Sequence, residues 1–247
     1  MTAITKMTSV ETKLFLRDPS APLIVVCLPL ILLLVFGMMP GIREPSADFG
    51  GKSGLSVFIA PMAVAILLTM LALTIFPGAM ATYREKGVLR RLSASPVPPR
   101  QLLLAQLLVN LGSAIVVVAL ILGVGKLALG MDLPRNFGGF ALTLVLGTAA
   151  LFSVGMLIAA VAPTGRAANG IGSVTFFPML ALGGVWVPKE QLPVFLRHVA
   201  DILPLGATFN TLRETWAGNS PQLLPLLSLV VFTAVCGLLA AKFFRWE

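Results

Sequence analysis

The 247-residue sequence is 57% hydrophobic and only 11% charged, with eighteen Lys and Arg against ten Asp and Glu. Soluble domains carry about 25% charged residues, so this composition excludes an ordinary soluble enzyme or binding domain. It indicates an integral membrane protein. The formal net charge of +8 calls for no nucleic-acid partner, because membrane topology accounts for most of it.

Six charge-free intervals are long enough to cross a bilayer as helices. Each has at least 22 residues, and about 20 apolar residues suffice for a helical span. Their apolar runs are continuous rather than alternating, which excludes strands of the membrane-barrel type. The sequence therefore predicts an all-α integral membrane protein, a single transmembrane domain over residues 1–247, with six transmembrane helices at about 21–40, 57–82, 102–127, 138–161, 169–187 and 223–244.

The basic residues predict the orientation of these spans. An even number of spans puts both termini on one side, together with the loop between spans two and three and the turn before span five. Eleven of the eighteen Lys and Arg fall on that side. Because basic loop residues favour the cytoplasmic face, both termini are expected in the cytoplasm.

Residues 3–18 predict an N-terminal interfacial helix. Apolar side chains such as Met7 and Phe15 share one side, whereas Lys6 and Lys13 occupy the other. Glu11 intrudes at the edge of the apolar side. A signal peptide is the alternative, but the following apolar stretch from Ala21 to Met39 is too long for the core of one.

A basic loop, Tyr83–Gln101, separates predicted spans two and three. Val88, Leu89 and Leu92 fall on one side of a short amphipathic helix, and the basic residues occupy its other sides. Gly87 lets the chain bend before this helix. Membrane topology alone would account for the basic charges of this loop. Any further role of the loop therefore has to be argued from the rest of its sequence pattern.

The pattern R-E-x-G-x-L-x-x-L-x-x-x-P in this loop resembles the cytoplasmic coupling helix of ABC-2 type transporter permeases. That family includes drug-resistance (daunorubicin-type) and polysaccharide or lipo-oligosaccharide export permeases. A second pattern, G-G-x-x-x-P-x-x-x-L-P from Gly183 to Pro193, also resembles the family. The resemblance implies that the loop presses on a separate ATPase subunit, with Leu89 and Leu92 docking in a groove and the charges setting register. The implied ATPase-coupling residues are Arg84, Glu85, Gly87, Leu89, Arg90, Arg91 and Leu92.

The segments around span five are unusual. Small residues and a proline interrupt that span, which indicates either close helix packing or a helix that lines a substrate path. The candidate path residues are Asn169, Phe176, Phe177 and Pro178. Between spans five and six, apolar residues repeat at helical spacing around Phe195 and again from Phe209 to Trp216, which predicts two short re-entrant outer helices.

The chain lacks the residues for chemistry of its own. The stretch Gly50–Gly54 superficially matches a phosphate-binding loop, but Ser46 stands where that motif needs glycine. His198 is the only histidine, so no metal site is expected. We therefore expect no catalytic residues and no cofactor in this chain, with ATP and Mg bound by a partner ATPase. The six predicted spans also lack Asp, Glu and His, which disfavours an ion-coupled carrier.

The resemblance implies the membrane subunit of a type V ABC exporter in the bacterial cytoplasmic (inner) membrane. Its implied partners are an ABC ATPase subunit, a second copy of the chain in a homodimer of two permeases plus two ATPases, and membrane lipid. The expected cargo is hydrophobic or amphipathic, a drug, natural product or lipid-linked molecule. A glycolipid or polysaccharide exporter of the same family, an ion-coupled carrier, and a membrane enzyme or structural protein remain alternatives. The sequence leaves open the cargo and whether a related permease replaces the second copy.

Overall fold

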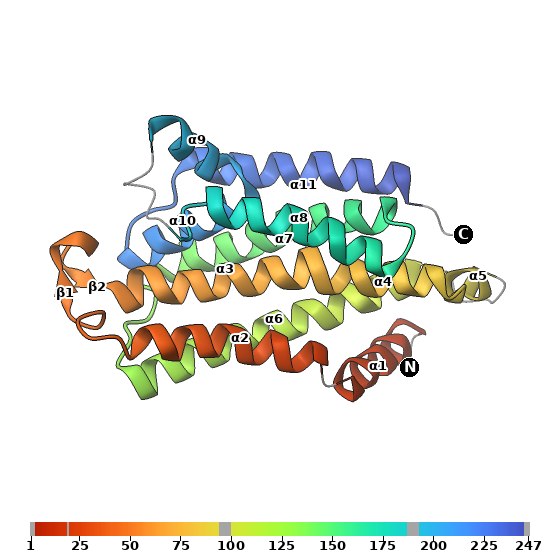
Figure 1. The fold of residues 1–247 in the computed structure, drawn as a ribbon, viewed down its shortest axis with the longest axis horizontal. Coiled ribbons are helices and arrows are strands. Elements are labelled where there is room, and N and C mark those ends of the chain that lie inside the picture. Colours follow the sequence, from red (N-terminus) through yellow and green to blue (C-terminus); the bar gives the residue numbers. More distant parts are fainter. Residues whose placement is uncertain (1–2, 19, 94–99, 187–192, 245–247) are drawn as a thin grey trace.

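The computed structural model describes residues 3–18, 20–93, 100–186 and 193–244, and within these ranges the chain is almost entirely helical (Figure 1). One two-residue antiparallel pair, β1 with β2, closes the loop after α2. In chain order the elements are α1 (Ala3–Arg17), α2 (Ser20–Gly37), β1 (Pro45–Ser46), η1 (Ala47–Phe49), β2 (Lys52–Ser53), η2 (Leu55–Ile59), α3 (Ala60–Met70), η3 (Leu71–Ile75), α4 (Phe76–Glu85), α5 (Val88–Ser93), α6 (Arg100–Leu129), α7 (Phe137–Val161), α8 (Gly165–Leu182), α9 (Val194–Ile202), α10 (Pro204–Ala217) and α11 (Leu223–Phe243).

The bundle is built around one continuous helix, Leu55–Glu85, which comprises η2, α3, η3 and α4. Of its most apolar stretch, 78% is buried, compared with 33% for α6 and 22% for α11. The central helix packs against α2 and α6 on one side and against α7 and α8 on the other, and α11 packs outside α7 (Figure 1). The apolar residues of α6 and α11 therefore largely face outward, as expected of helices in contact with lipid.

Two glycines allow α7 and α8 to approach the centre of this helix. The segment η3 is a π-helical turn, a feature often found at functional sites. A methyl group on Gly155 of α7 would lie 1.9 Å from the carbonyl oxygen of Ala72, and one on Gly172 of α8 would lie 2.0 Å from that of Leu73. Any larger residue would push these helices apart, so glycine is required at both crossings.

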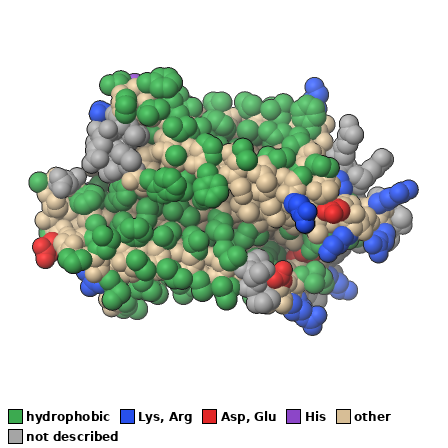
Figure 2. Space-filling view, viewed as in Figure 1, with side chains coloured by type: hydrophobic (Ala, Val, Ile, Leu, Met, Phe, Trp, Pro, Cys, Tyr) green, Lys and Arg blue, Asp and Glu red, His purple; other side chains and the backbone are tan. Residues whose placement is uncertain are grey.

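The two ends of the bundle differ in character. The helices α1 and α5 lie at one end with the C-terminal end of α11, whereas the β1–β2 pair, α9 and α10 lie at the other (Figure 1). In the view of Figure 2, hydrophobic side chains cover the middle of the molecule, and Lys and Arg gather at the end that carries α1 and α5. The structure thus places α5, α1 and the C-terminal end of α11 at one end of the bundle.

Each of the six predicted spans coincides with a helix, but not every helix is apolar enough to be counted as a span. Within the described ranges, four helices have the length and composition to cross a membrane: Leu55–Glu85, Arg100–Leu129, Phe137–Val161 and Leu223–Phe243. A fifth is added if α1 and α2, which meet at a 65° bend, form one broken span. The chain is therefore a multi-pass all-α membrane protein, and its six-span layout remains a prediction.

The predicted pair of helices between spans five and six is present, but only one of them has an apolar surface turned outward. On α9, Val194 is 67% and Phe195 75% exposed, which suits a helix at a membrane interface. On α10, by contrast, Phe209 and Leu212 are fully buried and Trp216 is 1% exposed. The expectation that the α10 stripe enters the lipid is therefore wrong, because that stripe packs into the chain's own core. Pro188 and Leu192 of the second family pattern lie outside the described residues.

Candidate functional site

Three consecutive residues at the end of α4, Tyr83, Arg84 and Glu85, connect the central helix to most of its neighbours. We refer to Tyr83–Glu85 as the hub. It lies at the basic end of the bundle, immediately before the turn into α5 (Figure 1). Successive residues of a helix point about 100° apart, so three of them in a row reach three different surroundings.

Arg84 binds the C-terminal end of α7. Its guanidinium donates hydrogen bonds to the carbonyl oxygens of Ala160 at 3.1 Å and Ala162 at 2.9 Å, and also to that of Ala159. The last carbonyls of a helix have no partner within the helix and carry a partial negative charge. A planar cation with several donors satisfies them together, so Arg84 fixes the end of α7 against α4.

Glu85 binds the N-terminal end of α8. Its Oε2 accepts a hydrogen bond of 3.0 Å from the backbone N–H of Gly165, the first residue of that helix. Thr164 caps the same end by accepting from the N–H of Ala167 at 3.1 Å. A carboxylate at a helix N-terminus is favoured by the partial positive charge there. Arg84 and Glu85 thus hold both sides of the short turn between α7 and α8.

Tyr83 connects the hub to α1 and α6 through a buried acid. Its hydroxyl donates to Oε2 of Glu11 at 2.7 Å, and the side-chain amide of Gln106 donates to the same oxygen at 2.5 Å. Glu11 is only 5% exposed. Burial raises the pKa of its carboxyl above the ordinary value of 4.5, and the two hydrogen bonds oppose that rise.

The helix α5 is seated on the bundle by its apolar side. Gly87 has φ +67°, a left-handed conformation that lets the chain reverse between α4 and α5, as the sequence predicts. Leu89 is 1% exposed and belongs to the main hydrophobic core, and Leu92 packs against that core. Arg90 and Arg91 are exposed.

The burial of Leu89 bears on the expectation that it docks in a groove of an ATPase. A leucine that is already enclosed by its own chain cannot enter a groove on a partner without first leaving the core. Within the described chain Leu89 positions α5. The exposed residues of the stretch, which a partner could contact directly, are Glu85, Lys86, Arg90, Arg91 and Arg100. Residues 94–99, the rest of the predicted loop before α6, lie outside the described ranges.

The sequence missed two residues of this site. In the sequence pattern Glu11 is only an intrusion in an apolar face, and nothing distinguishes Gln106. An acid that interrupts the buried side of an amphipathic helix was the available signal, since such a group needs a hydrogen-bonding partner. No sequence pattern predicts the contact of Arg84 with the α7 carbonyls, because every residue type has the same backbone carbonyl.

The four candidate path residues lie together on α8 but form no cavity within the described part of one chain. Asn169, Phe177 and Pro178 are exposed, and Phe176 is half-buried with its ring 5.4 Å from that of Phe177. They follow an outward stripe that includes Val174, which is 74% exposed. A path along this stripe would need a second surface to close it.

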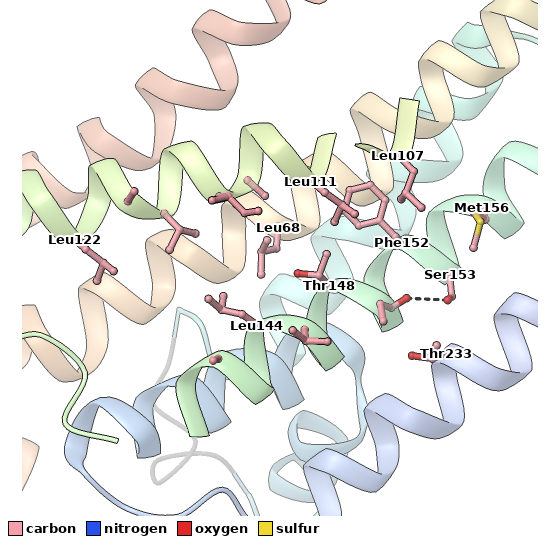
Figure 3. Close-up of a pocket in the computed structure, with 17 residues that line it drawn as sticks. Leu68, Leu107, Leu111, Leu122, Leu144, Thr148, Phe152, Ser153, Met156 and Thr233 are labelled. Atoms are coloured by element: carbon pink, nitrogen blue, oxygen red, sulfur yellow. Dashed lines mark hydrogen bonds between the residues drawn. The ribbon is translucent and has the colours of Figure 1, made fainter. Parts of the chain in front are cut away.

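A separate cavity of about 790 Å³ lies among α3, α6, α7 and α11. Figure 3 shows Leu111 and Leu122 of α6 facing Leu144 and Phe152 of α7 across it, with Leu68 of α3 behind them. Nearly all of its lining side chains are apolar. None of the four candidate path residues contributes to it.

Comparison with known proteins identifies the family. The profile described as "ABC-2 type transporter" matches residues 2–216. The chain belongs to the ABC-2 type transporter family. The matched region contains α1, the hub, α5 and all of α10 except Ala217.

The similarity to individual relatives covers only part of this chain and part of each relative. The chain is 26% identical over 192 residues to the "Probable multidrug ABC transporter permease YbhR" of Escherichia coli K12, covering 76% of this chain and 52% of that protein. It is 25% identical over 146 residues to the "Inner membrane transport permease YhhJ" of the same organism, covering 58% and 38%. Over 81 residues it is 33% identical to "Nodulation protein J" of Rhizobium leguminosarum bv. viciae, covering 32% and 31%. The chain thus spans about half the length, or less, of these curated relatives.

Proposed function

We propose that this chain is the permease subunit of an ATP-driven exporter in the bacterial cytoplasmic membrane, with ATP and Mg bound and hydrolysed by a separate ABC ATPase subunit. The family membership supports a transport permease. The observation that carries the rest is the hub, which joins the end of α4 to α1, α6, α7 and α8 directly beside the exposed basic surface of α5.

In this proposal an ATPase pushes on α5 through Lys86, Arg90 and Arg91. Because Leu89 is buried in the core, α5 cannot slide freely over the bundle, and the push passes into α4. The hub then transmits this push to α1 and α6 through Glu11 and Gln106, and to the ends of α7 and α8. Rigid elements joined at one point move together, which is the geometry needed to convert closure of an ATPase into a tilt of the spans.

The transport path is proposed to form between two copies of the chain. The exposed stripe of α8, with Val174 and Phe177, has no covering element in the described part of the chain. A second copy related by a two-fold axis would face the same stripe and enclose a space between the two. Such a path, lined by Phe176 and Phe177 and lacking acids, suits a hydrophobic or amphipathic cargo. The name of YbhR, a probable multidrug permease, agrees with this class.

The test is transport by the chain together with its ATPase in inside-out vesicles, with substrate uptake and ATP hydrolysis measured on the same sample. Glu85→Ala removes the bond to the N-terminus of α8 and should lower the amount transported per ATP several-fold while the ATPase still binds. Arg166→Ala is the matched control, because Arg166 is exposed at the start of α8 and its replacement leaves the hub intact. Transport by the purified chain alone without ATP would overturn the proposal, as would unchanged coupling in Glu85→Ala.

A further inference from the structure

The cavity among α3, α6, α7 and α11 offers almost no group that could bind water or a polar ligand. Three hydroxyls line it, those of Thr148, Ser153 and Thr233 (Figure 3). Ser153 donates to the carbonyl oxygen of Ala149 at 2.7 Å and Thr233 to that of Leu229 at 2.7 Å, so two of the three are satisfied within their own helices. A cavity with such walls favours an apolar occupant.

The cavity opens sideways at the depth of the membrane core. All four helices that form its walls, the one that contains α3 and α6, α7 and α11, have the length and composition of membrane spans. Ile115 on α6 is 70% and Val145 on α7 66% exposed, and both line the cavity, so it is not sealed from its surroundings. What surrounds it at this depth is the hydrocarbon of lipid.

The volume decides between a lipid chain and a helix as the occupant. A membrane-spanning helix is about 10 Å wide and 30 Å long, roughly 2,000 Å³. The cavity, at about 790 Å³, is far smaller than that. It lies instead within the range of about 300–1,000 Å³ in which proteins hold small ligands.

A lysine side chain lies beyond one end of the cavity. Lys126 is exposed and follows Leu122, a lining residue, by four positions on α6, so the two lie on the same face of that helix. Lys126 is therefore one turn beyond the cavity, at the end of the bundle opposite α5 (Figure 1). A lysine at that depth can extend its ammonium to the level of lipid phosphates.

We propose that this cavity binds one acyl chain of an anionic phospholipid from the leaflet on the Lys126 side, with the lipid phosphate at the Lys126 ammonium. The apolar walls take the chain and the lysine fixes the headgroup, so the lipid is held at one position rather than exchanging freely around the bundle. This site does not depend on the chain being an exporter, since it requires only that the protein lies in a membrane.

The experiment uses the full-length chain in vesicles of phosphatidylethanolamine and phosphatidylglycerol, with part of the phosphatidylglycerol carrying a photoreactive diazirine on one acyl chain. After irradiation, mass spectrometry maps the lipid adducts. Adducts should concentrate several-fold on residues 107–122 and 141–156 relative to the outward face of α11 at Val235 and Leu238. An even distribution over all exposed apolar residues would show ordinary surrounding lipid and overturn the proposal.

Variants separate filling of the cavity from a change of fold. Ala119→Trp and Ala141→Trp fill it from opposite walls, each from an exposed rim position, and should reduce the adducts several-fold. Val116→Trp is the matched control, because Val116 lies on α6 at the same depth but outside the lining. Equal adducts in all three variants would refute the acyl-chain site. A disulfide between two chains of an Ala119→Cys variant would show that a second copy covers the cavity, and would overturn it as well.

A separate comparison tests the contact between Lys126 and the lipid headgroup. Lys126→Gln should lower the yield of phosphatidylglycerol adducts several-fold. Lys242→Gln should not, because Lys242 is an exposed lysine at the C-terminal end of α11, at the opposite end of the bundle from Lys126. Replacing the probe by a phosphatidylcholine that carries the same diazirine should also lower the yield in the wild-type chain, because its net charge is zero. If neither change lowers the yield, the assignment of Lys126 is wrong.

Discussion

Arg84 and Glu85 are neighbours in sequence that act on the ends of two different helices, and each charge has the sign that its helix end favours. The guanidinium meets the carbonyls at the end of α7, and the carboxylate meets the first N–H of α8. Each such contact is worth about 0.3–1 kcal/mol at an exposed site and more where it is partly buried. Together they fix the turn between α7 and α8 relative to α4.

Replacing Arg84 should therefore loosen this turn while the rest of the bundle stays folded. Arg84→Lys keeps the charge but cannot donate to several carbonyls in one plane, so we expect faster amide hydrogen exchange over residues 159–168. Arg166→Lys, on the exposed surface of the same turn, is the matched control. Exchange that is as slow in Arg84→Lys as in the control would show that only the charge matters.

Glu11 allows a test in which hydrogen bonding and charge are separated. Glu11→Gln keeps an oxygen that accepts from Tyr83 and Gln106, whereas Glu11→Ala leaves both donors without it. We expect Glu11→Ala to lower the free energy of unfolding by about 1–3 kcal/mol, the cost of unsatisfied buried groups, and Glu11→Gln to cost less. Thermal unfolding in one detergent measures both. Equal losses would mean that the bonds contribute nothing.

The same residue predicts a pH dependence. Because burial raises the pKa of Glu11 in the folded chain, the neutral carboxyl is favoured there. Its contribution to stability is fully present below the ordinary value of 4.5 and is lost as pH rises through the raised pKa. The melting temperature of the wild type should thus fall across that window more than that of Glu11→Gln. A parallel fall in both chains would assign the dependence to other groups.

At the scale of elements, α5 is defined by what lies on each of its sides. Its apolar side is enclosed by the bundle through Leu89 and Leu92, and its basic side, with Arg90 and Arg91, is exposed. The turn at Gly87 separates it from α4. A short helix held in this way has one exposed surface to offer a partner and one fixed route, through the hub, to the rest of the bundle.

Leu89→Ala should destabilise the seat of α5. A buried leucine that is cut back to alanine costs about 2–5 kcal/mol when the cavity cannot collapse. We expect a lower melting temperature, together with faster proteolysis at residues 86–93. Leu92→Ala, a partly buried residue on the same helix, should cost less. If Leu89→Ala retains the wild-type melting temperature but loses the ATPase in co-purification, Leu89 contacts the partner after all.

The sequence predicted these elements far better than it predicted their contacts. Continuous apolar runs and the glycine before Val88 identified the helices and the turn, because both signals are local. The enclosure of Leu89 and of Trp216 was not predictable, since an amphipathic helix has the same pattern whether its apolar side faces lipid, a partner or its own bundle. The contacts of Arg84 depend on backbone atoms about 76 residues away, which no local pattern encodes.

At the scale of the whole molecule, α8 is a predicted span that hydropathy alone does not select. It is absent from the helices that meet the length and hydropathy criteria, because Arg166, Asn169 and its glycines lower its hydropathy. Packing argues for a crossing. Its first residue is bound by Glu85 at the α5 end, and beyond its last turn Gly183 lies against Leu205 and Gly206 at the α10 end.

Its length agrees with that placement. Eighteen residues at a rise of 1.5 Å cover about 27 Å, close to the roughly 30 Å of bilayer hydrocarbon. Polar and small residues are tolerated in a span where neighbouring helices cover them, as Gly172 is covered by η3. Six spans therefore remain our prediction, although length and hydropathy alone select four or five in the described ranges.

Cysteine labelling at the two ends of α8 decides the matter, in a chain from which Cys27 and Cys236 have been removed. Arg166→Cys lies in the first turn of α8 and Val194→Cys follows the helix, and both positions are exposed. If α8 crosses, a membrane-impermeant maleimide should reach Val194→Cys from outside the cell and Arg166→Cys only after the membrane is opened. Lys86→Cys, beside the hub, should behave like Arg166→Cys, because Glu85 binds the first residue of α8 and holds the two positions at one end of the bundle. Labelling of Arg166→Cys and Val194→Cys from the same side would place α8 as a helix that enters and leaves through one face, and the prediction of six spans with both termini in the cytoplasm would then be wrong.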